Sequence, residues 1–347
     1  MYRDVGRSRV IVEVDYDKPG KQFGVLRVPQ SRNDSGWGTI AIPIVVIQHG
    51  SGPTVLFTAG NHGDEYEGQV AALNLARELA PAQVQGRVII LPAMHFPAAM
   101  NGTRLSPIDG KDFNRCFPGN PNGTFAEILA HYIASHLLPL ADFQMDLHSG
   151  GHSMDIVPST AAHALDDPDA MAKTRAAMAA FGAPLGIILT EVAGGPTLLA
   201  EAERQGVIAL SSELGGLGRV SIDGVEVTER GVRNILKHYG VLDGKPEPSP
   251  RYRPRFMRVP DFRHYVFAPQ PGIFQPYHAI GQEVAVGQPA GRILFIEDPD
   301  RAPVDLVYGA SGLLWSTRGA ARVQAGDPVA VIACADDGIE AGSVVRR

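Results

Sequence analysis

The chain has 347 residues, with 31 basic and 37 acidic side chains and a net charge of −6. Neither sign of charge forms blocks, which excludes the surfaces typical of nucleic-acid or anionic-membrane binding. No apolar run reaches the roughly 20 residues of a membrane span, and none follows the N-terminus as a secretory signal would. We therefore expect a cytoplasmic protein with a small-molecule substrate, and we leave open whether it forms a homo-oligomer.

The first 50 residues look β-rich and could pack with the C-terminal part of the chain. From about residue 54, short apolar runs alternate with longer amphipathic runs, which is typical of a sheet covered by helices. The expected strands lie at 54–58, 87–91, 143–147, 186–190 and 207–211. The expected helices lie at 65–79, 125–138, 170–181, 198–205 and 226–239.

A linker is predicted at 243–255, where glycine, proline and charged residues replace the apolar pattern. Short strand patterns with turn signals follow, and they resemble the barrel-like sandwich of biotinyl and lipoyl carrier domains. No lysine stands at an evident hairpin tip, so we interpret this tail as architectural. The predicted division is a β-rich segment at 1–50, a catalytic domain at 51–245 and a small all-β domain at 255–335.

Two imidazoles and one carboxylate stand where apolar strands end. His62 and Glu65 are three positions apart, and His148 closes a later strand. Three protein ligands, with a fourth position left to water, are typical of a catalytic zinc. We predict one Zn²⁺ per chain, bound by these three residues. The alternative is that His62 and Glu65 only form the polar start of a helix, where the dipole favours an acid.

Three polar residues near the second histidine have open roles. Asp146 lies two residues before His148 on the same strand face, so it either orients the imidazole or is an ordinary acid at a strand end. His152 follows closely enough to line a pocket. Asp155 or His152 could face a cationic group of the substrate.

An arginine-rich loop extends from Arg104 to beyond Arg115. Guanidinium groups bind carboxylates through two parallel hydrogen bonds, and Asn114 adds a neutral donor. Arg104 and Arg115 could therefore hold a substrate carboxylate and a developing oxyanion. The alternative is that these arginines pair with Asp109 and Asp112 and only stiffen the loop.

A hydrolase of this kind needs a base that takes a proton from water and passes it to the leaving amine. Glu213 stands where an apolar strand runs into a glycine turn. Glu191, in a glycine-rich loop, and Glu201, on an expected helix surface, are weaker candidates. Cys116 lies beside the arginine-rich loop, and we interpret it, like Cys334, as a free thiol; with a metal site available, Cys116 is a packed group rather than a nucleophile.

Four motifs resemble those of the succinylglutamate desuccinylase and aspartoacylase family, which shares its fold with the zinc carboxypeptidases. They occur in order along the chain: Gly60-Asn61-His62-Gly63-Asp64-Glu65, Asp112-Phe113-Asn114-Arg115, Asp146-Leu147-His148 and Glu213-Leu214-Gly215-Gly216. The resemblance covers about residues 50–240. It implies an α/β fold with a mixed sheet flanked by helices and a smaller all-β C-terminal domain. Phe113 stands where leucine is expected, an exchange that faces the core.

The resemblance also implies roles for single residues. His62, Glu65 and His148 would bind the zinc ion. Glu213 would act as general base and then general acid, and Arg104 would polarise the scissile carbonyl.

Asn114 and Arg115 would bind a substrate carboxylate. The spacing of the arginine-rich loop and Ser149-Gly150-Gly151 are most similar to the bacterial N-acetyl-diaminobutyrate deacetylases of ectoine breakdown. We therefore expect a zinc-dependent deacylase that hydrolyses the amide bond of an N-acyl amino acid, with N-acetyl-2,4-diaminobutyrate as the candidate substrate. The alternatives are a zinc carboxypeptidase for short peptides and a non-catalytic metal-dependent binding protein.

Overall fold

A computed structural model describes residues 8–190 and 195–336 of the chain. Three neighbouring parallel strands occupy the centre of its main sheet: β4 (Thr54–Ala59), β6 (Phe143–His148) and β10 (Ile208–Glu213). β4 and β6 are buried along their whole length. Both faces of such strands are covered. β4 is accordingly largely apolar, whereas β6 also carries the buried polar side chains of Gln144 and Asp146.

Every helix and strand expected between residues 54 and 239 is present, with ends shifted by a few residues. The other strands of this part are β1 (Ile11–Val12), β2 (Gly20–Pro29), β3 (Thr39–His49), β5 (Gly86–Leu91), β7 (Met154–Ile156), β8 (Ser159–His163), β9 (Leu185–Leu189) and β11 (Arg255–Val259). The helices are α1 (Glu67–Glu78), α2 (Phe96–Asn101), α3 (Phe125–Tyr132), α4 (Pro168–Phe181), α5 (Leu198–Arg204) and α6 (Ile222–His238). The second expected helix continues beyond α3 as a π-helical turn, Ile133–Leu137.

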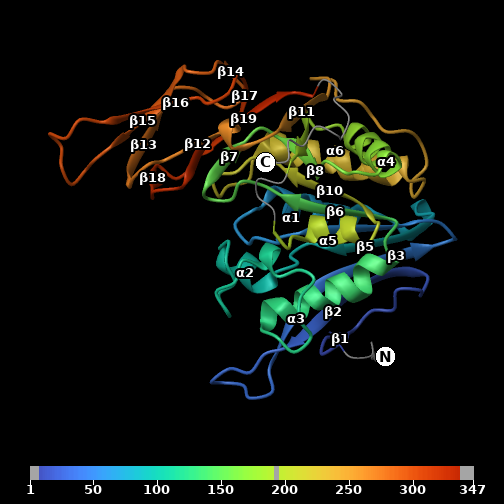
Figure 1. Cartoon of the computed structure of the whole chain (residues 1–347). Helices are drawn as coiled ribbons and strands as arrows, with labels where there is room; N and C mark the ends of the chain where they lie inside the picture. Colours follow the sequence, from blue (N-terminus) through green and yellow to red (C-terminus); the bar gives the residue numbers. More distant parts are fainter. Residues whose placement is uncertain (1–7, 191–194, 337–347) are drawn as a thin grey trace.

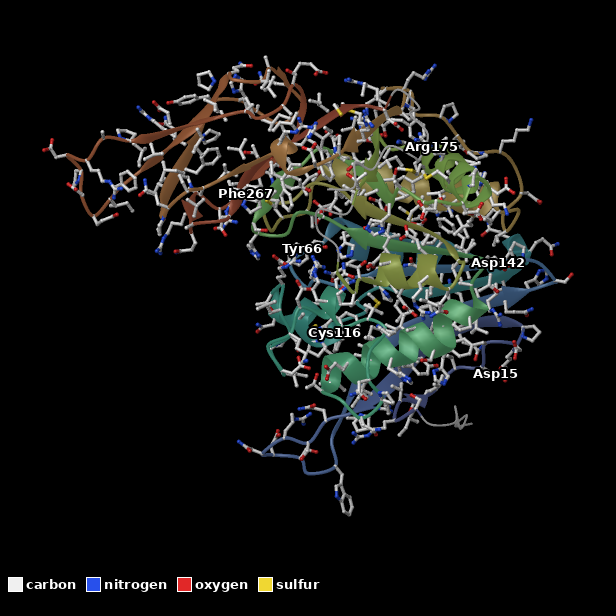
Figure 2. All side chains as sticks on the ribbon, in the orientation of Figure 1. Asp15, Tyr66, Cys116, Asp142, Arg175 and Phe267 are labelled. Atoms are coloured by element: carbon white, nitrogen blue, oxygen red, sulfur yellow. The ribbon has the colours of Figure 1, made fainter. Side chains whose placement is uncertain are left out.

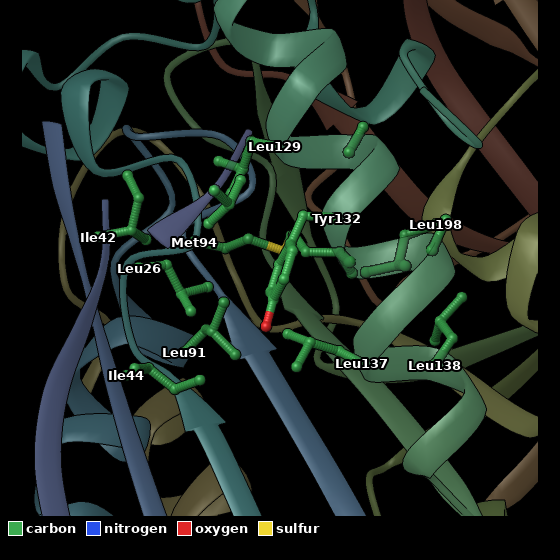
Figure 3. Close-up of a cluster of buried hydrophobic side chains, with 14 of the residues drawn as sticks. Leu26, Ile42, Ile44, Leu91, Met94, Leu129, Tyr132, Leu137, Leu138 and Leu198 are labelled. Atoms are coloured by element: carbon green, nitrogen blue, oxygen red, sulfur yellow. The ribbon is translucent and has the colours of Figure 1, made fainter. Parts of the chain in front are cut away.

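Two hydrophobic layers cover the two faces of this sheet. Side chains alternate along a strand, so Leu56 joins the layer that contains α3 and α5, whereas Val55 and Phe57 join the layer that contains α1, α4 and α6. Figure 3 shows the first layer, where Tyr132 of α3 reaches in among aliphatic side chains such as Leu26. The predicted arrangement of a mixed sheet flanked by helices is confirmed.

The C-terminal part adds a small antiparallel sheet, drawn in orange and red in Figure 1. The strands of the C-terminal part are β12 (Tyr265–Phe267), β13 (Gly272–Pro276), β14 (Glu283–Val284), β15 (Pro289–Leu294), β16 (Val304–Val307), β17 (Gly312–Arg318), β18 (Arg322–Val323) and β19 (Pro328–Ala335). β16, β15, β13 and β18 form the separate sheet. β19 pairs with β11, and β17 pairs with β7, so this tail is hydrogen-bonded to the main sheet.

The expectation that the first 50 residues pack with the tail is wrong. The main sheet follows the order β1-β2-β3-β5-β4-β6-β10-β8-β9-β11-β19-β17-β14, so β1 to β3 and the tail strands lie at opposite ends. β3 pairs with β5 over Val45–His49, and its buried side chains belong to the layers on β4 and β5. The β-rich start therefore extends the main sheet.

Within the described part of the chain, no helix combines the length and the apolar character that a bilayer span requires.

Gly68 allows α1 to approach β6 closely, and its replacement tests this packing. A Cβ atom at Gly68 would lie 2.5 Å from the Cβ of Leu147 and 2.6 Å from its carbonyl oxygen. Gly68→Ala should therefore lower the free energy of unfolding by about 1–3 kcal/mol, the usual effect of overpacking. Urea denaturation measures it. Gly36→Ala, at a position with open space, is the control, and equal stability of the two variants would contradict this packing.

Candidate active site

The carboxyl ends of the three central strands bring the predicted site residues together. β4 is followed by His62 and Glu65, β6 ends at His148, and β10 ends at Glu213. The register pairs Glu213 directly with His148 across β10 and β6. Open α/β sheets bind ligands at this edge of their parallel strands. The fold therefore places a candidate site where the sequence motifs predicted one.

The first group in the site is His62, Glu65 and His148, whose ligand atoms all lie within 4.8 Å of one another. The side chains are buried, with exposed fractions of 3%, 2% and 5%. Glu65 places one carboxylate oxygen 2.6 Å from Nδ1 of His62 and the other 2.7 Å from Nδ1 of His148. These three residues can share one metal ion.

The outer nitrogens of both imidazoles are held by carboxylates. Nε2 of His62 lies 3.1 Å from Asp112, and Nε2 of His148 lies 2.7 Å from Asp146. Carboxylates in this position fix the ring orientation of metal-binding histidines and make them better ligands. Both Nδ1 atoms face Glu65, so the donor set and its supporting groups fit a metal ion. Of the two readings of Asp146, the structure supports the one in which it orients the imidazole.

Asp146 is itself held on both oxygens. Thr58 donates to one oxygen at 2.7 Å, and Asn61 donates to the other at 2.8 Å. Thr58 lies directly opposite Asp146 in the β4–β6 register. The orientation of His148 therefore depends on two strands and on the turn after β4.

The buried charges balance one another. Burial alone would lower the pKa of His148, but Asp146 and Glu65 outweigh it and raise this pKa well above its usual range. Burial alone would raise the pKa of Glu65, yet the two histidines hold it well below its usual range. Glu65 and Asp112 likewise outweigh burial and raise the pKa of His62, so both imidazoles favour a proton when no metal ion is bound. A divalent cation can take the place of these protons, because metal binding to histidine releases them.

Glu213 stands apart from this pairing. Its Oε2 atom is buried and has no hydrogen-bond partner in the structure. Burial, and then the negative charge of Glu65, raises its pKa to about 7. A carboxyl group with a pKa near neutral can accept and return a proton at the operating pH of most enzymes.

The arginine-rich loop reaches the site through Arg104. Its guanidinium donates to Asp112 at 2.9 Å and lies 3.4 Å from Nδ1 of His62. The alternative in which an arginine–aspartate pair stiffens the loop therefore holds for Arg104 and Asp112. Asp109 instead accepts a backbone hydrogen bond from Ala126. Arg104 thus contacts both the loop and the metal-binding group.

Asn114 and Arg115 differ in how firmly they are held. The Asn114 side chain accepts from the backbone N–H of Leu198 at 3.0 Å, and its Nδ2 lies 3.5 Å from Nε2 of His148. Arg115 donates only to the backbone oxygen of Asn114 and makes no ion pair among the described residues. Phe113, between the loop and α3, is fully buried beside His95. The loop is thus anchored in the core, while the exposed Arg115 makes no ion pair with a described residue.

A cavity of about 180 Å³ connects these groups. All seven predicted site residues line it: His62, Glu65, Arg104, Asn114, Arg115, His148 and Glu213. Met154 and Ile156 of β7 also line it. The structure thus brings the predicted residues into one place, and their individual roles stay predictions.

The other candidate residues that the structure describes do not line this cavity. His152 keeps 62% of its side chain exposed and bonds to Asp64, and Asp155 lines a different cavity. Glu201 pairs with an arginine on α5, and Glu191 lies outside the described residues.

Cys116 has no property of a nucleophile. Burial raises the pKa of its thiol to about 11, and its sulfur donates to the backbone oxygen of Asp112. Figure 2 shows it within the body of the molecule. The interpretation of Cys116 as a packed thiol is supported.

The sequence reasoning missed several residues that support the site. From the sequence, Asp112 is only a candidate partner for arginine. A loop has no periodicity from which the direction of the Asp112 side chain could be deduced. Thr58 and Asn61 were detectable, since they stand at the end of a predicted strand. β7 gave no signal, because it has only three residues.

Comparisons with known proteins identify the family of this chain. The catalytic-domain model of the succinylglutamate desuccinylase/aspartoacylase family matches residues 51–239. This chain belongs to that family. An N-alpha-acetyl-L-2,4-diaminobutyric acid deacetylase from Halomonas elongata is 40% identical over 94% of this chain and 95% of its own length.

Two solved structures are also similar over nearly the whole chain. A succinylglutamate desuccinylase/aspartoacylase from Rhodobacter sphaeroides is 50% identical, with a TM-score of 0.92, over 95% of this chain and 100% of its own. The product-bound ectoine utilization protein EutE (DoeB) from Ruegeria pomeroyi is 38% identical, with a TM-score of 0.90, over 94% and 99%. The predicted class, a hydrolase acting on linear amide bonds, is confirmed. The alternative function given above, a non-catalytic metal-dependent binding protein, is thereby excluded.

Asp146→Asn tests the support of the metal-binding group. It removes the negative charge beside Nε2 of His148, so metal affinity should fall about 10–100-fold. Competition between the protein and a chromophoric chelator for Zn²⁺ measures the affinity. Asp305→Asn, on the exposed side of β16, should leave it unchanged. An unaltered affinity in Asp146→Asn would contradict the role of this carboxylate.

Proposed function

We propose that the protein is a zinc-dependent deacylase that hydrolyses the amide bond of an N-acyl amino acid, releasing a carboxylate and the free amino acid. The observation that carries this proposal is the buried His62, Glu65 and His148 group beside the unpartnered Glu213 carboxyl. Zinc suits two imidazoles and one carboxylate with an open fourth position. The two free thiols also fit the proposed cytoplasmic location.

The bound ion would lower the pKa of a water ligand and polarise the acyl carbonyl. Glu213 would accept a proton from the attacking water and deliver it to the departing amine. Its raised pKa, near 7, suits both transfers. Arg104, which lies beside His62, would donate to the oxyanion that develops on the carbonyl oxygen.

Arg115 and Asn114 would hold the α-carboxylate of the substrate. Arg115 makes no ion pair among the described residues, so its guanidinium is available for a carboxylate. Asn114 is fixed by its bond to α5 and points its amide nitrogen toward the metal-binding group. Holding the carboxylate there would keep the scissile amide beside Glu213.

The charges around the cavity favour a substrate with one carboxylate. With both histidines bound to the metal ion, Arg104 and Arg115 are the remaining cationic side chains of the described cavity lining, and Arg104 is already paired with Asp112. A succinyl group or an aspartate side chain would bring a second carboxylate without a free partner. We therefore propose an acetyl group, and N-acetyl-2,4-diaminobutyrate as substrate, in line with the name of the Halomonas elongata relative.

Replacing the proposed base separates catalysis from metal binding. Glu213→Gln should lower kcat by about 10²–10⁴-fold, the usual contribution of a general base, with unchanged zinc content. Turnover by release of free amine, together with metal analysis, checks both. Glu78→Gln, at an exposed site on α1, is the control. Near-normal turnover in Glu213→Gln would disprove the proposed mechanism.

A substrate screen tests the charge argument. The zinc-loaded enzyme should release amine from N-acetyl-2,4-diaminobutyrate at a kcat/KM at least about tenfold above that for N-acetylaspartate or N-succinylglutamate, because a carboxylate without a partner costs 1.4 kcal/mol or more. Short peptides should also be poor substrates. Chelation should abolish turnover, and added Zn²⁺ should restore it. Preference for a dicarboxylate would overturn the proposed substrate class.

A further inference from the structure

A second and larger cavity lies behind the turn that follows β10. Its volume is about 460 Å³, within the usual range of small-molecule sites. We call it the rear cavity. Its lining comes from β7 and the β7–β8 connection, the residue before β9, the turn after Glu213, the start of α6, the linker before β11 and Ile280 of the tail. It lies at the junction of the main sheet and the tail, and the proposed function does not use it.

Two unpaired ionisable groups of opposite charge face the rear cavity. Asp155 and Arg219 both line it, and neither makes an ion pair among the described residues. Burial raises the pKa of Asp155 more strongly than the charge of Arg219 and the backbone N–H of Ile156 lower it, so the two side chains interact electrostatically. Their separation nevertheless exceeds the 4.0 Å limit of a salt bridge. The cavity thus offers one cation and one anion with a gap between them.

The remaining charged and polar groups of the rear cavity have partners. Arg251 pairs with Asp223 and Glu226, and Tyr252 donates to the backbone oxygen of Gly182. These groups therefore shape the wall and do not compete for a charged ligand. Only Asp155 and Arg219 are left to select it.

The rest of the wall is largely aliphatic. Ile156, Pro184, Val227 and Ile280 line the cavity beside the two charges. An apolar wall with a few polar groups is typical of a site for a small organic ligand. A ligand that satisfies this wall carries an ammonium, a carboxylate and a short aliphatic group.

We propose that the rear cavity is a second binding site, which takes a free aliphatic α-amino acid. Its carboxylate binds Arg219, its ammonium binds Asp155, and its side chain packs against the aliphatic wall. The site is distinct from the catalytic cavity, whose acyl substrate carries no free α-ammonium. The inference does not depend on the proposed deacylase activity.

The two cavities share a wall. Ile156 lines both of them, and Gly215 and Gly216 of the rear cavity follow Glu213 by two and three residues. The backbone oxygen of Gly215 accepts from Gly150, which lines the catalytic cavity. A Cβ atom at Gly216 would lie 1.9 Å from the backbone oxygen of Met154, so this wall is packed backbone against backbone. An occupant of the rear cavity therefore contacts the segment that carries Glu213.

The test is a binding titration of the zinc-loaded protein with L-valine. Isobutylamine, which lacks the carboxylate, and 3-methylbutanoate, which lacks the ammonium, are the matched probes. Calorimetry should detect L-valine and neither analogue, and L-valine should raise the thermal unfolding midpoint. Fluorescence of a Trp37→Phe variant gives a second readout, because Trp37 is fully exposed and Trp315 is buried in the same cluster as Ile156.

Substitutions in the rear cavity and in the catalytic cavity test where the amino acid binds. Asp155→Asn and Arg219→Gln should each weaken L-valine binding at least about tenfold, because each removes a charged hydrogen-bond partner. Arg115→Gln, in the catalytic cavity, should leave the affinity unchanged. Unaltered unfolding midpoints without ligand show that the variants fold. Absence of L-valine binding, binding of both analogues as tightly as L-valine, or loss of binding in Arg115→Gln instead would overturn the proposal.

Discussion

The structure depends on the burial of one carboxylate, that of Glu65. A buried carboxylate costs several kcal/mol unless it is paired and hydrogen-bonded. Both of its oxygens are therefore engaged, one by His62 after β4 and one by His148 at the end of β6. Because each buried imidazole then needs its own carboxylate, Asp112 and Asp146 complete the cluster. These successive charge pairs explain why the ends of β4 and β6 and the arginine-rich loop meet at one place.

The sequence predicted the central strands and the residues of the candidate metal site because both depend on local patterns. Buried strands are short and largely apolar, and the carboxyl ends of parallel strands meet at one edge. His148 and Glu213 stand at such ends, so their place at one edge of the sheet could be deduced, whereas their direct pairing is seen only in the structure. The family resemblance added the roles of Arg104, Asn114 and Arg115, which lie in a loop that has no period.

The features that the sequence did not predict depend on contacts between segments that are far apart along the chain. The direction of Asp112 is fixed by His62 and Arg104, fifty and eight residues away. The place of β1 to β3 is set by pairing with β5, and an amphipathic strand pattern does not say which edge it joins. Asp155 looked close to the substrate because it is near His148 in sequence. It lines the rear cavity, whereas its neighbour Met154 lines the catalytic cavity and Ile156 lines both.

The pairing of β7 with β17 joins the catalytic region to the tail. Met154 and Ile156 belong to the matched catalytic region, residues 51–239, yet the strand that they form is hydrogen-bonded to Arg318 and Ser316 of the tail. A chain cut at residue 239 would keep every residue that lines the catalytic cavity and expose β7 as an unpaired edge. One wall of the cavity is therefore held in place from outside the region that supplies its side chains.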